Sequence, residues 1–190
     1  MANQVELALF SGGAVTTANP VPVTQTGGDG STPISASNPL PTVGQSYSAS
    51  ATFTPAAASH VAGDVNGGAQ TFALGAISGS RIMITSASLQ ISSATAEATA
   101  WRLYLFNVTP PSALADDAAF TLPTGDLASF LGYVDLGTAV DLVDNQWVET
   151  NIINKQIKLS GTGVFGYLVN LTTLTPANVA HIVTLHAVGL

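Results

Sequence analysis

From residue 47 onward the chain is a series of short runs rich in β-branched and aromatic residues, separated by Gly, Pro, Ser, Asn and Asp. This pattern is typical of an all-β sandwich or barrel. It predicts about eight strands, at Tyr47–Thr54, Gln70–Ile77, Arg81–Ser92, Ala100–Val108, Leu131–Leu136, Gln146–Leu159, Val164–Leu171 and His181–Val188. Ser112–Ala119 and Pro176–Ala180 permit helix but are too short for more than single turns.

Two of these ranges indicate how their strands are buried. Ala100–Val108 is apolar or amphipathic on both faces, which predicts a central strand that ends at Pro110. Arg81–Ser92 has the alternation of a strand with one solvated face. Its apolar set is Met83, Ala87, Leu89 and Ile91, and its polar set is Ser86, Ser88 and Gln90. We expect these two strands to pair as neighbours.

The fold class that best accommodates these strands is an all-β, jelly-roll-like antiparallel β-sandwich, with other sandwiches and a closed barrel as competitors. The apolar side chains suffice for its core, and we expect the fold to stand without a cofactor. The predicted core residues are Phe53, Phe72, Leu74, Ile82, Ile84, Leu89, Ile91, Leu103, Leu105, Leu131, Val134, Ile152, Ile157, Leu159, Phe165, Leu168, Val169, Ile182, Val183 and Leu185.

The first 45 residues differ from the rest and read as an extended arm, so we divide the chain into an arm, 1–45, and a β-sandwich body, 46–190. Prolines at alternating positions force extended geometry and remove strand donors. They occur at Pro20 and Pro22 and again at Pro39 and Pro41. The arm begins with an apolar cluster that is costly to leave in water, so we expect it to dock on a partner. This cluster is Val5, Leu7, Leu9 and Phe10.

Charge and composition exclude several functions. Only 8% of residues are charged, and the net charge of -7 is the wrong sign for binding phosphate backbones. The chain has no Cys, so it has no disulfide framework, thiolate metal site or thiol nucleophile. No apolar run approaches the ~20 residues of a membrane-spanning helix. We therefore expect no nucleic-acid or membrane partner, and synthesis in a cytosol because the N-terminus lacks the pattern of a secretory signal.

The histidines and acids give no catalytic constellation. His181 and His186 lie five apart in a predicted strand, so they face opposite sides and do not chelate one ion. His60 lies in a Gly-bounded loop, where a hydrogen bond to Asp64 is possible. The acids between residues 116 and 149 lack the spacing of a calcium loop and the aromatic platforms of a glycosidase cleft, so loop-capping is the default interpretation. We expect no enzyme, no metal and no cofactor.

Several segments resemble structural proteins of tailed bacteriophages. Ala49–Gly68 carries one part of the likeness, and Trp101–Asn107, Ala115–Phe120 and Phe130–Val134 carry another. The Asn-Pro-Leu-Pro stretch is similar to the N-terminal arms of virion proteins. The resemblance implies a head decoration or cement protein on the virion capsid surface, with a jelly-roll body and an arm on the capsid lattice.

The expected partners are therefore the major capsid protein and further copies of the chain, with a trimer favoured. The candidate contact residues are the apolar cluster Val5, Leu7, Leu9 and Phe10 and the four alternating prolines. The alternative is a carbohydrate-binding host-recognition module on a head fibre or tail, because jelly rolls also serve as lectins. Tyr133, Asp144 and Trp147 are the candidate glycan contacts for that alternative.

Overall fold

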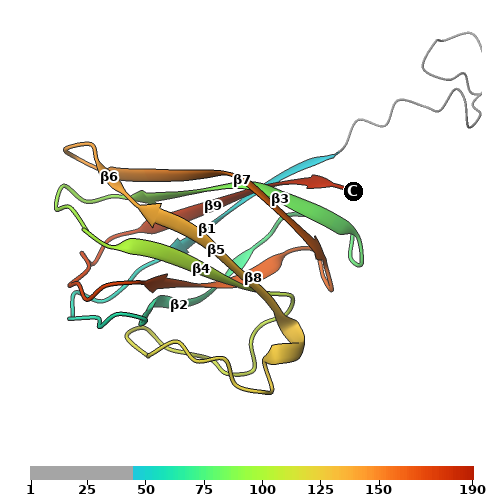
Figure 1. Ribbon diagram of the computed structural model, residues 1–190, viewed down its shortest axis with the longest axis horizontal. Helices are drawn as coiled ribbons and strands as arrows, with labels where there is room; N and C mark the ends of the chain where they lie inside the picture. Colours follow the sequence, from blue (N-terminus) through green and yellow to red (C-terminus); the bar gives the residue numbers. More distant parts are fainter. Residues whose placement is uncertain (1–44) are drawn as a thin grey trace, which may run out of the picture. The chain divides into compact units, whose positions relative to one another are not determined.

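The computed structural model describes residues 45–190 as two antiparallel sheets packed face to face (Figure 1). The predicted arm lies outside the described residues, apart from Gln45. The strands are β1 (Ser46–Phe53), β2 (Val65–Phe72), β3 (Arg81–Ile91), β4 (Ala100–Phe106), β5 (Phe130–Thr138), β6 (Val140–Asp141), β7 (Gln146–Lys158), β8 (Val164–Asn170) and β9 (His181–Gly189).

The sheet topology is that of a jelly roll. The first sheet has the order β1-β9-β3-β7-β6, and the second has the order β2-β8-β4-β5. Apart from the two-residue β6, strands that are consecutive in the chain alternate between the sheets, with β4 and β5 as the one pair that stays together. This arrangement, two sheets of four long strands each, confirms the predicted all-β, jelly-roll-like sandwich.

Seven of the eight predicted strands begin and end within two residues of the observed bounds. The exception is β2, which was predicted at Gln70–Ile77 and begins five residues earlier. Gly67 and Gly68 lie inside the observed strand, with φ of 75° and 69°. They form a bulge in the register with β8, which is a common use of glycine within a strand.

The predicted pairing of the third and fourth strands is wrong. Strand β3 pairs with β7 and β9 in the first sheet, whereas β4 pairs with β5 and β8 in the second. Both patterns were read correctly as strands, but alternation reports only which side chains are buried. It carries no information on the partner strand.

The main core lies between the two sheets and includes Phe53, Phe72, Leu89 and Trp101, which are all fully buried. Ile152 was predicted to belong to it but is 81% exposed. The cause is a bulge in β7, where the three residues 152–154 oppose Thr85 alone, so that the alternation of faces changes phase. Three further predicted core residues, Leu131, Phe165 and Ile182, are only half-buried.

A second irregularity, at Thr85 of β3, changes the face of Met83, because Thr85 has no residue opposite it in β9. This side chain is half-buried and lies between Ile82 and Ile84, which are both in the core. Met83 therefore points away from the core, whereas Ala87, Leu89 and Ile91 point into it as predicted.

A second, smaller cluster covers the outer face of the second sheet. Phe106 and Tyr167 are its largest buried members, and the β4–β5 connection brings Leu114 and Phe120 onto them. The Tyr167 hydroxyl fixes this connection, because it donates to Ser112 O at 2.8 Å and accepts from Leu114 N at 3.1 Å.

The helical content is small. The connection from β4 to β5 ends in a short 3-10 helix, Leu127–Ser129, and residues 45–190 contain no α-helix. Within this part of the chain, no helix has the length and apolar character needed to cross a bilayer.

Candidate binding surfaces

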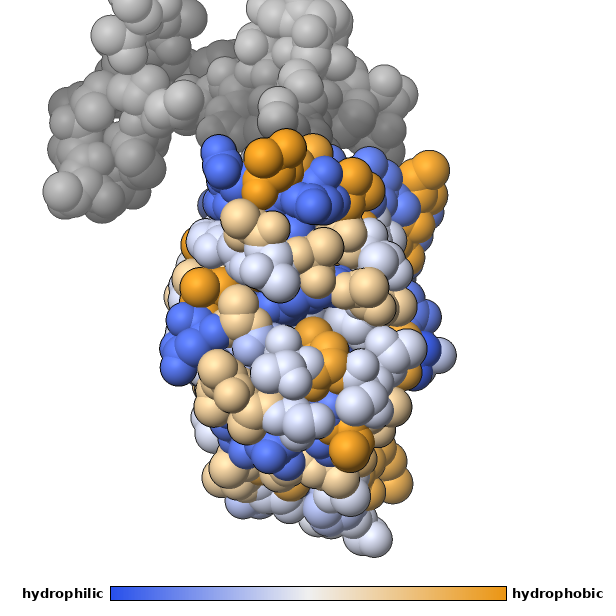
Figure 2. All heavy atoms as spheres, turned by 90° about the vertical axis from the view of Figure 1, so that its left-hand side faces the viewer, coloured by the Kyte–Doolittle hydropathy of each residue, from blue (hydrophilic) through white to orange (hydrophobic). Residues whose placement is uncertain are grey.

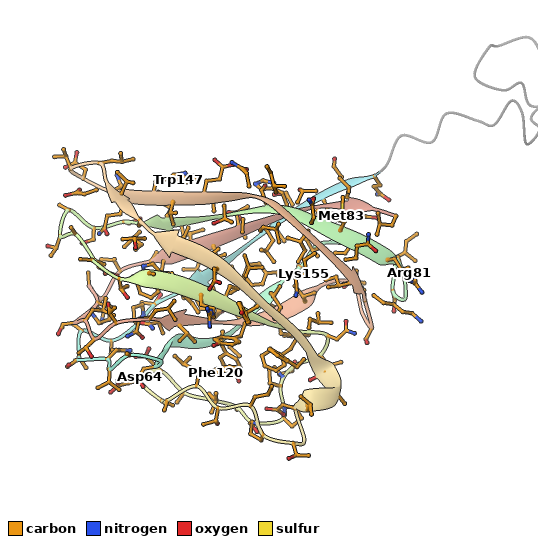
Figure 3. The ribbon with its side chains drawn as sticks, in the orientation of Figure 1. Asp64, Arg81, Met83, Phe120, Trp147 and Lys155 are labelled. Atoms are coloured by element: carbon orange, nitrogen blue, oxygen red, sulfur yellow. The ribbon has the colours of Figure 1, made fainter. Side chains whose placement is uncertain are left out.

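The proposed arm contacts, Val5, Leu7, Leu9, Phe10, Pro20, Pro22, Pro39 and Pro41, lie outside the described residues. The three proposed glycan contacts are exposed, but they lie on different sheets. Trp147 is the second residue of β7, and Asp144 precedes that strand in the β6–β7 hairpin of the first sheet, whereas Tyr133 lies on β5 of the second. Figure 3 shows Trp147 on one side of the sandwich and Phe120 on the other.

Tyr133 belongs instead to a charged and aromatic cluster that the sequence did not indicate. Arg102 Nε donates to Asp135 Oδ1 at 2.6 Å, and its guanidinium lies 4.0 Å from the centre of the Tyr133 ring. The hydrogen bond to Asp135 raises the pKa of Arg102 above its ordinary value. Because the guanidinium occupies one face of Tyr133, that face of the ring is closed to a ligand.

The outer face of the first sheet presents uncharged hydroxyl groups. One row across the four long strands reads Ser50, Thr184, Ser88 and Glu149, and the next reads Ser48, His186, Ser86 and Asn151. Ser50 Oγ and Thr184 Oγ1 lie 2.8 Å apart. Glu149 is the one carboxylate in these two rows, and neither row contains Lys or Arg. His186 is exposed here while His181 is buried, as the five-residue spacing predicted.

The β6–β7 hairpin carries exposed apolar side chains at one corner of this sheet. Val140, Leu142 and Val143 are 63%, 59% and 77% exposed, and Trp147 follows at 41%. Figure 2 looks at this end of the sandwich and shows hydrophobic residues among hydrophilic ones at its upper rim, where the hairpin lies. Contiguous apolar groups of this kind are typical of interaction sites.

Two exposed β-branched residues have a left-handed backbone. Val143 has φ of 78° in the hairpin loop, and Ile152 has φ of 62° in the β7 bulge. Left-handed backbone disfavours β-branched side chains, and burial offers no compensation here because both residues are more than three-quarters exposed. Strain that brings no packing is characteristic of residues that act on a partner.

His60 does not bond Asp64, contrary to the sequence-based expectation. The Asp64 carboxylate instead accepts from Val61 N at 2.6 Å. The His60 ring is fully buried, and its nitrogens lie 3.9 Å from Asp116 Oδ2 and 3.8 Å from Asp117 Oδ1. Neither nitrogen makes a hydrogen bond within residues 45–190. The backbone pairs with Leu174 in both directions, so the residue anchors a loop.

His181 takes part in a buried hydrogen-bond network at the start of β9. Its Nε2 lies 2.8 Å from Glu97 Oε2, and its Nδ1 lies 3.1 Å from Val179 O. A carbonyl oxygen only accepts, so Nδ1 carries a hydrogen and one further proton lies between His181 and Glu97. Glu97 also accepts from Ala177 N, and its own N–H donates to Gln146. The network joins two loops, the β3–β4 and β8–β9 connections, to β7 and β9, which is a structural role.

The acids act mainly as loop caps. Asp116 accepts from Ala56 N at 2.8 Å and from Gly67 N at 2.6 Å, and thereby holds two segments together. Asp126 accepts from Ser112 N, and Asp141 accepts from Val143 N. Among the described residues, no three His, Asp or Glu side chains are grouped as metal ligands.

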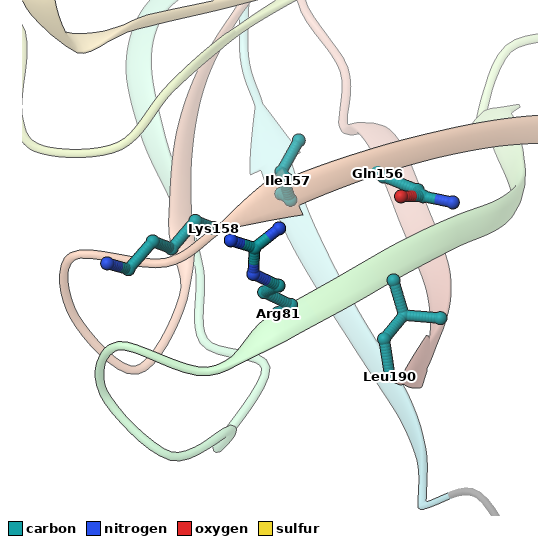
Figure 4. A pocket seen from close by; sticks show the side chains of 5 residues that line it. All are labelled: Arg81, Gln156, Ile157, Lys158 and Leu190. Atoms are coloured by element: carbon teal, nitrogen blue, oxygen red, sulfur yellow. The ribbon is translucent and has the colours of Figure 1, made fainter.

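A shallow basic hollow of about 240 Å³ lies where β3 begins and β7 ends (Figure 4). Arg81 and Lys158 line it and are opposite each other in the register of the two strands. Gln156, Ile157 and Leu190 complete the lining. Arg81 and Lys158 are the charged side chains of the hollow, and no carboxylate side chain lines it.

No protein-family model matches this sequence, and no curated protein matches it.

Proposed function

We propose that this protein is a non-enzymatic structural component of a tailed-bacteriophage virion. It binds the capsid surface, where the major capsid protein is its partner, and it decorates and stabilises the head lattice. Contacts come from the extended N-terminal arm and from the body, and copies of the chain associate as homo-oligomers, with a trimer favoured. The protein is made in the bacterial host cytoplasm and located on the virion.

The observation that carries this proposal is the exposed apolar surface of the β6–β7 hairpin beside the outer face of the first sheet, which is rich in hydroxyl groups and poor in charge. Leu142 and Val143 lie in the hairpin loop, more than half exposed, and Trp147 follows them. Interface centres are depleted of charge and enriched in aromatic residues. A hydroxyl-rich sheet face with an apolar corner therefore suits contact with another protein surface. The sequence resemblance to virion proteins supports the choice of the capsid as that surface.

The experiment compares full-length protein and two matched variants for binding to purified heads that lack it. Leu142 and Leu127 have the same exposure, 59%, but Leu127 lies in the short 3-10 helix, outside the proposed surface. We expect Leu142→Ser to weaken co-sedimentation with heads about tenfold, as loss of a well-packed apolar contact does. Leu127→Ser is expected to bind like the wild type. Equal binding by all three proteins contradicts a contact through the hairpin.

The alternative is a glycan-binding module, and one observation favours it. Tyr133 is 47% exposed and lies beside Arg102 and Asp135, which together offer an aromatic ring with polar groups. It is the weaker candidate because the guanidinium covers one face of that ring, and because Asp144 and Trp147 lie on the other sheet. The alternative is supported if the wild type binds on a glycan array and Tyr133→Ala abolishes that binding.

A further inference from the structure

Within residues 45–190, the outer edge of β1 is a regular strand edge whose backbone groups have no strand partner. The register pairs Ser46 with Val188, and Gly189 N donates to Gln45 O. In an antiparallel ladder, alternate residues point their N–H and C=O to the same side. Odd-numbered residues of β1 therefore bond β9, and Ser46, Ser48 and Ser50 direct their N–H and C=O groups outward. Among the described strands, none pairs with this side.

The other sheet edges within residues 45–190 are protected. Strand β2 carries the bulge at Gly67, and the β4–β5 connection covers it through Val65 N to Ala118 O and Asp117 N to Val65 O. Strand β5 has two register shifts against β4. Strand β6 covers only Gln146 and Trp147 of β7, and the rest of that edge carries the bulge at residues 152–154 together with Lys155 and Lys158. Natural sheets use such bulges, covering loops and short strands to prevent edge pairing. Strand β1 has none of these, and it carries neither Lys nor Pro.

The side chains of β1 leave room for an added strand. Ala49 and Ala51 face the core with 8% and 6% exposure, and the outward-pointing residues are small hydroxyl residues. An apolar strand beside β1 therefore extends the core past the two alanines without a steric obstacle. At the far end of the strand, Gly67 of β2 closes the edge, because a Cβ on it comes within 2.5 Å of Thr54 N. The open stretch is Ser46–Thr52.

We propose that this edge receives residues Val5–Phe10 of a second copy of the chain as an added antiparallel or parallel strand. The segment reads Val-Glu-Leu-Ala-Leu-Phe, so Val5, Leu7 and Leu9 share one face of a strand. Main-chain hydrogen bonds supply the affinity and the apolar face supplies the burial.

The occupant belongs to a neighbouring copy because of the intervening sequence. Residues 11–44 contain five prolines, which favour extended geometry over a compact return to the same body. A chain of that length reaches on the order of 100 Å when extended. The inference deepens the proposed function, since the same arm that connects copies lies on the capsid lattice.

The test is disulfide trapping in full-length protein, and the chain suits it because it has no cysteine of its own. If Val5, Leu7 and Leu9 face the core, Ala8 faces outward with Ser48 and Ser50. Ala8→Cys is therefore combined in turn with Ser46→Cys, Ser48→Cys and Ser50→Cys. Thr71→Cys, an exposed position on the covered edge of β2, is the matched control. We expect cross-linked oligomers in at least one β1 combination and none above background with Thr71→Cys.

A second measurement is amide hydrogen exchange of the full-length protein. The outward N–H groups of Ser48 and Ser50 are expected to exchange at least about tenfold more slowly in the wild type than in a Leu7→Glu/Leu9→Glu variant. Equal exchange in the two proteins overturns the proposal, and so does a cross-linked product of monomer size, which assigns the segment to its own body. Binding to heads is measured separately. If the wild-type protein has slow exchange at the β1 edge but does not bind heads, only the proposed function is contradicted.

Discussion

His181 Nε2 and Glu97 Oε2 lie 2.8 Å apart, and the two residues are 0% and 4% exposed. Glu97 reaches the pair from the β3–β4 connection, whereas His181 begins β9. The contact therefore closes one end of the sandwich between segments 84 residues apart in the chain. Its energetic role is to satisfy buried polar groups, because removal of one partner leaves the other buried without its hydrogen bond.

Loss of the Glu97 carboxylate is therefore expected to be costly. Glu97→Ala should lower the free energy of unfolding by about 3–5 kcal/mol, the usual effect of breaking a buried pair. Glu97→Gln keeps an acceptor for Ala177 N and a donor for the ring, so its effect should be smaller. Urea unfolding followed by circular dichroism measures both. Glu149→Ala, an exposed carboxylate on β7, is the control and should stay within about 0.5 kcal/mol of the wild type.

The buried phenol of Tyr167 is expected to make the stability of the body decline at alkaline pH. Burial raises the pKa of its phenol above 10.0, so folding favours the protonated form. The stabilisation is fully present below the pKa of the unfolded chain, near 10, and is lost as pH rises through the folded pKa. Tyr167→Phe should cost about 1–2 kcal/mol at pH 7 through its two lost hydrogen bonds. The variant should also lose stability less steeply above pH ~10, because the phenol whose ionisation destabilises the wild type is absent.

A Tyr133→Phe variant is the comparison for that titration, since Tyr133 is half-exposed on the same sheet. The account is contradicted if Tyr167→Phe and the wild type lose stability in parallel above pH ~10.

Gly67 of β2 lies against the backbone at the end of β1, at Phe53 and Thr54. It has φ of 75°, and an added Cβ comes within 2.5 Å of Thr54 N. Gly67→Ala should therefore destabilise the body by about 2–4 kcal/mol, through backbone strain and overpacking together. Gly75 has a similar φ of 68° but open space around it, so Gly75→Ala should cost only about 1 kcal/mol. Thermal unfolding of the two variants measures the difference, which is the cost of the close contact at Gly67. Equal losses of stability would show that this contact has no extra cost.

The left-handed backbone of Val143 and Ile152 is expected to lower the free energy of unfolding, and the Val143 side chain is expected to contribute to head binding. Replacement by Asn, which tolerates the left-handed region, is expected to raise the free energy of unfolding by about 0.5–1 kcal/mol at each position. The same Val143→Asn change is expected to weaken head binding, because it removes an apolar side chain from the hairpin. Asn154 occupies the β7 bulge with φ of 49°, so Asn154→Val is the reverse control and should destabilise. If the Asn variants are no more stable than the wild type, the two residues are not strained.

The sequence predicted strands better than it predicted partners. Arg81–Ile91 and Ala100–Phe106 were located almost to the residue because alternation and apolar runs are local properties. Their assignment to different sheets depends on contacts between distant segments, which alternation does not encode. Positions that interrupt the pattern caused the main errors, since the bulge at Gly67 displaced β2 and the bulge at Ile152 exposed a residue predicted to be buried.

The same limit applies to the candidate sites. Exposed side chains at Trp147 and Tyr133 were a reasonable expectation for aromatic residues near loops. The two residues are far apart because β7 and β5 belong to different sheets, which the sequence pattern does not reveal. Arg102 and Asp135 were not paired in advance because their contact follows from the register of β4 against β5. His60 and Asp64 are close in sequence, yet the nearer Val61 N–H takes the carboxylate.

The most direct test of the proposed function is a cryo-electron map of purified virions with and without this protein. The account predicts extra density of jelly-roll shape at regular symmetry positions of the capsid, together with heads that burst more easily when the protein is missing. Density confined to a tail or fibre tip, with heads of unchanged strength, would contradict a role in decorating the capsid.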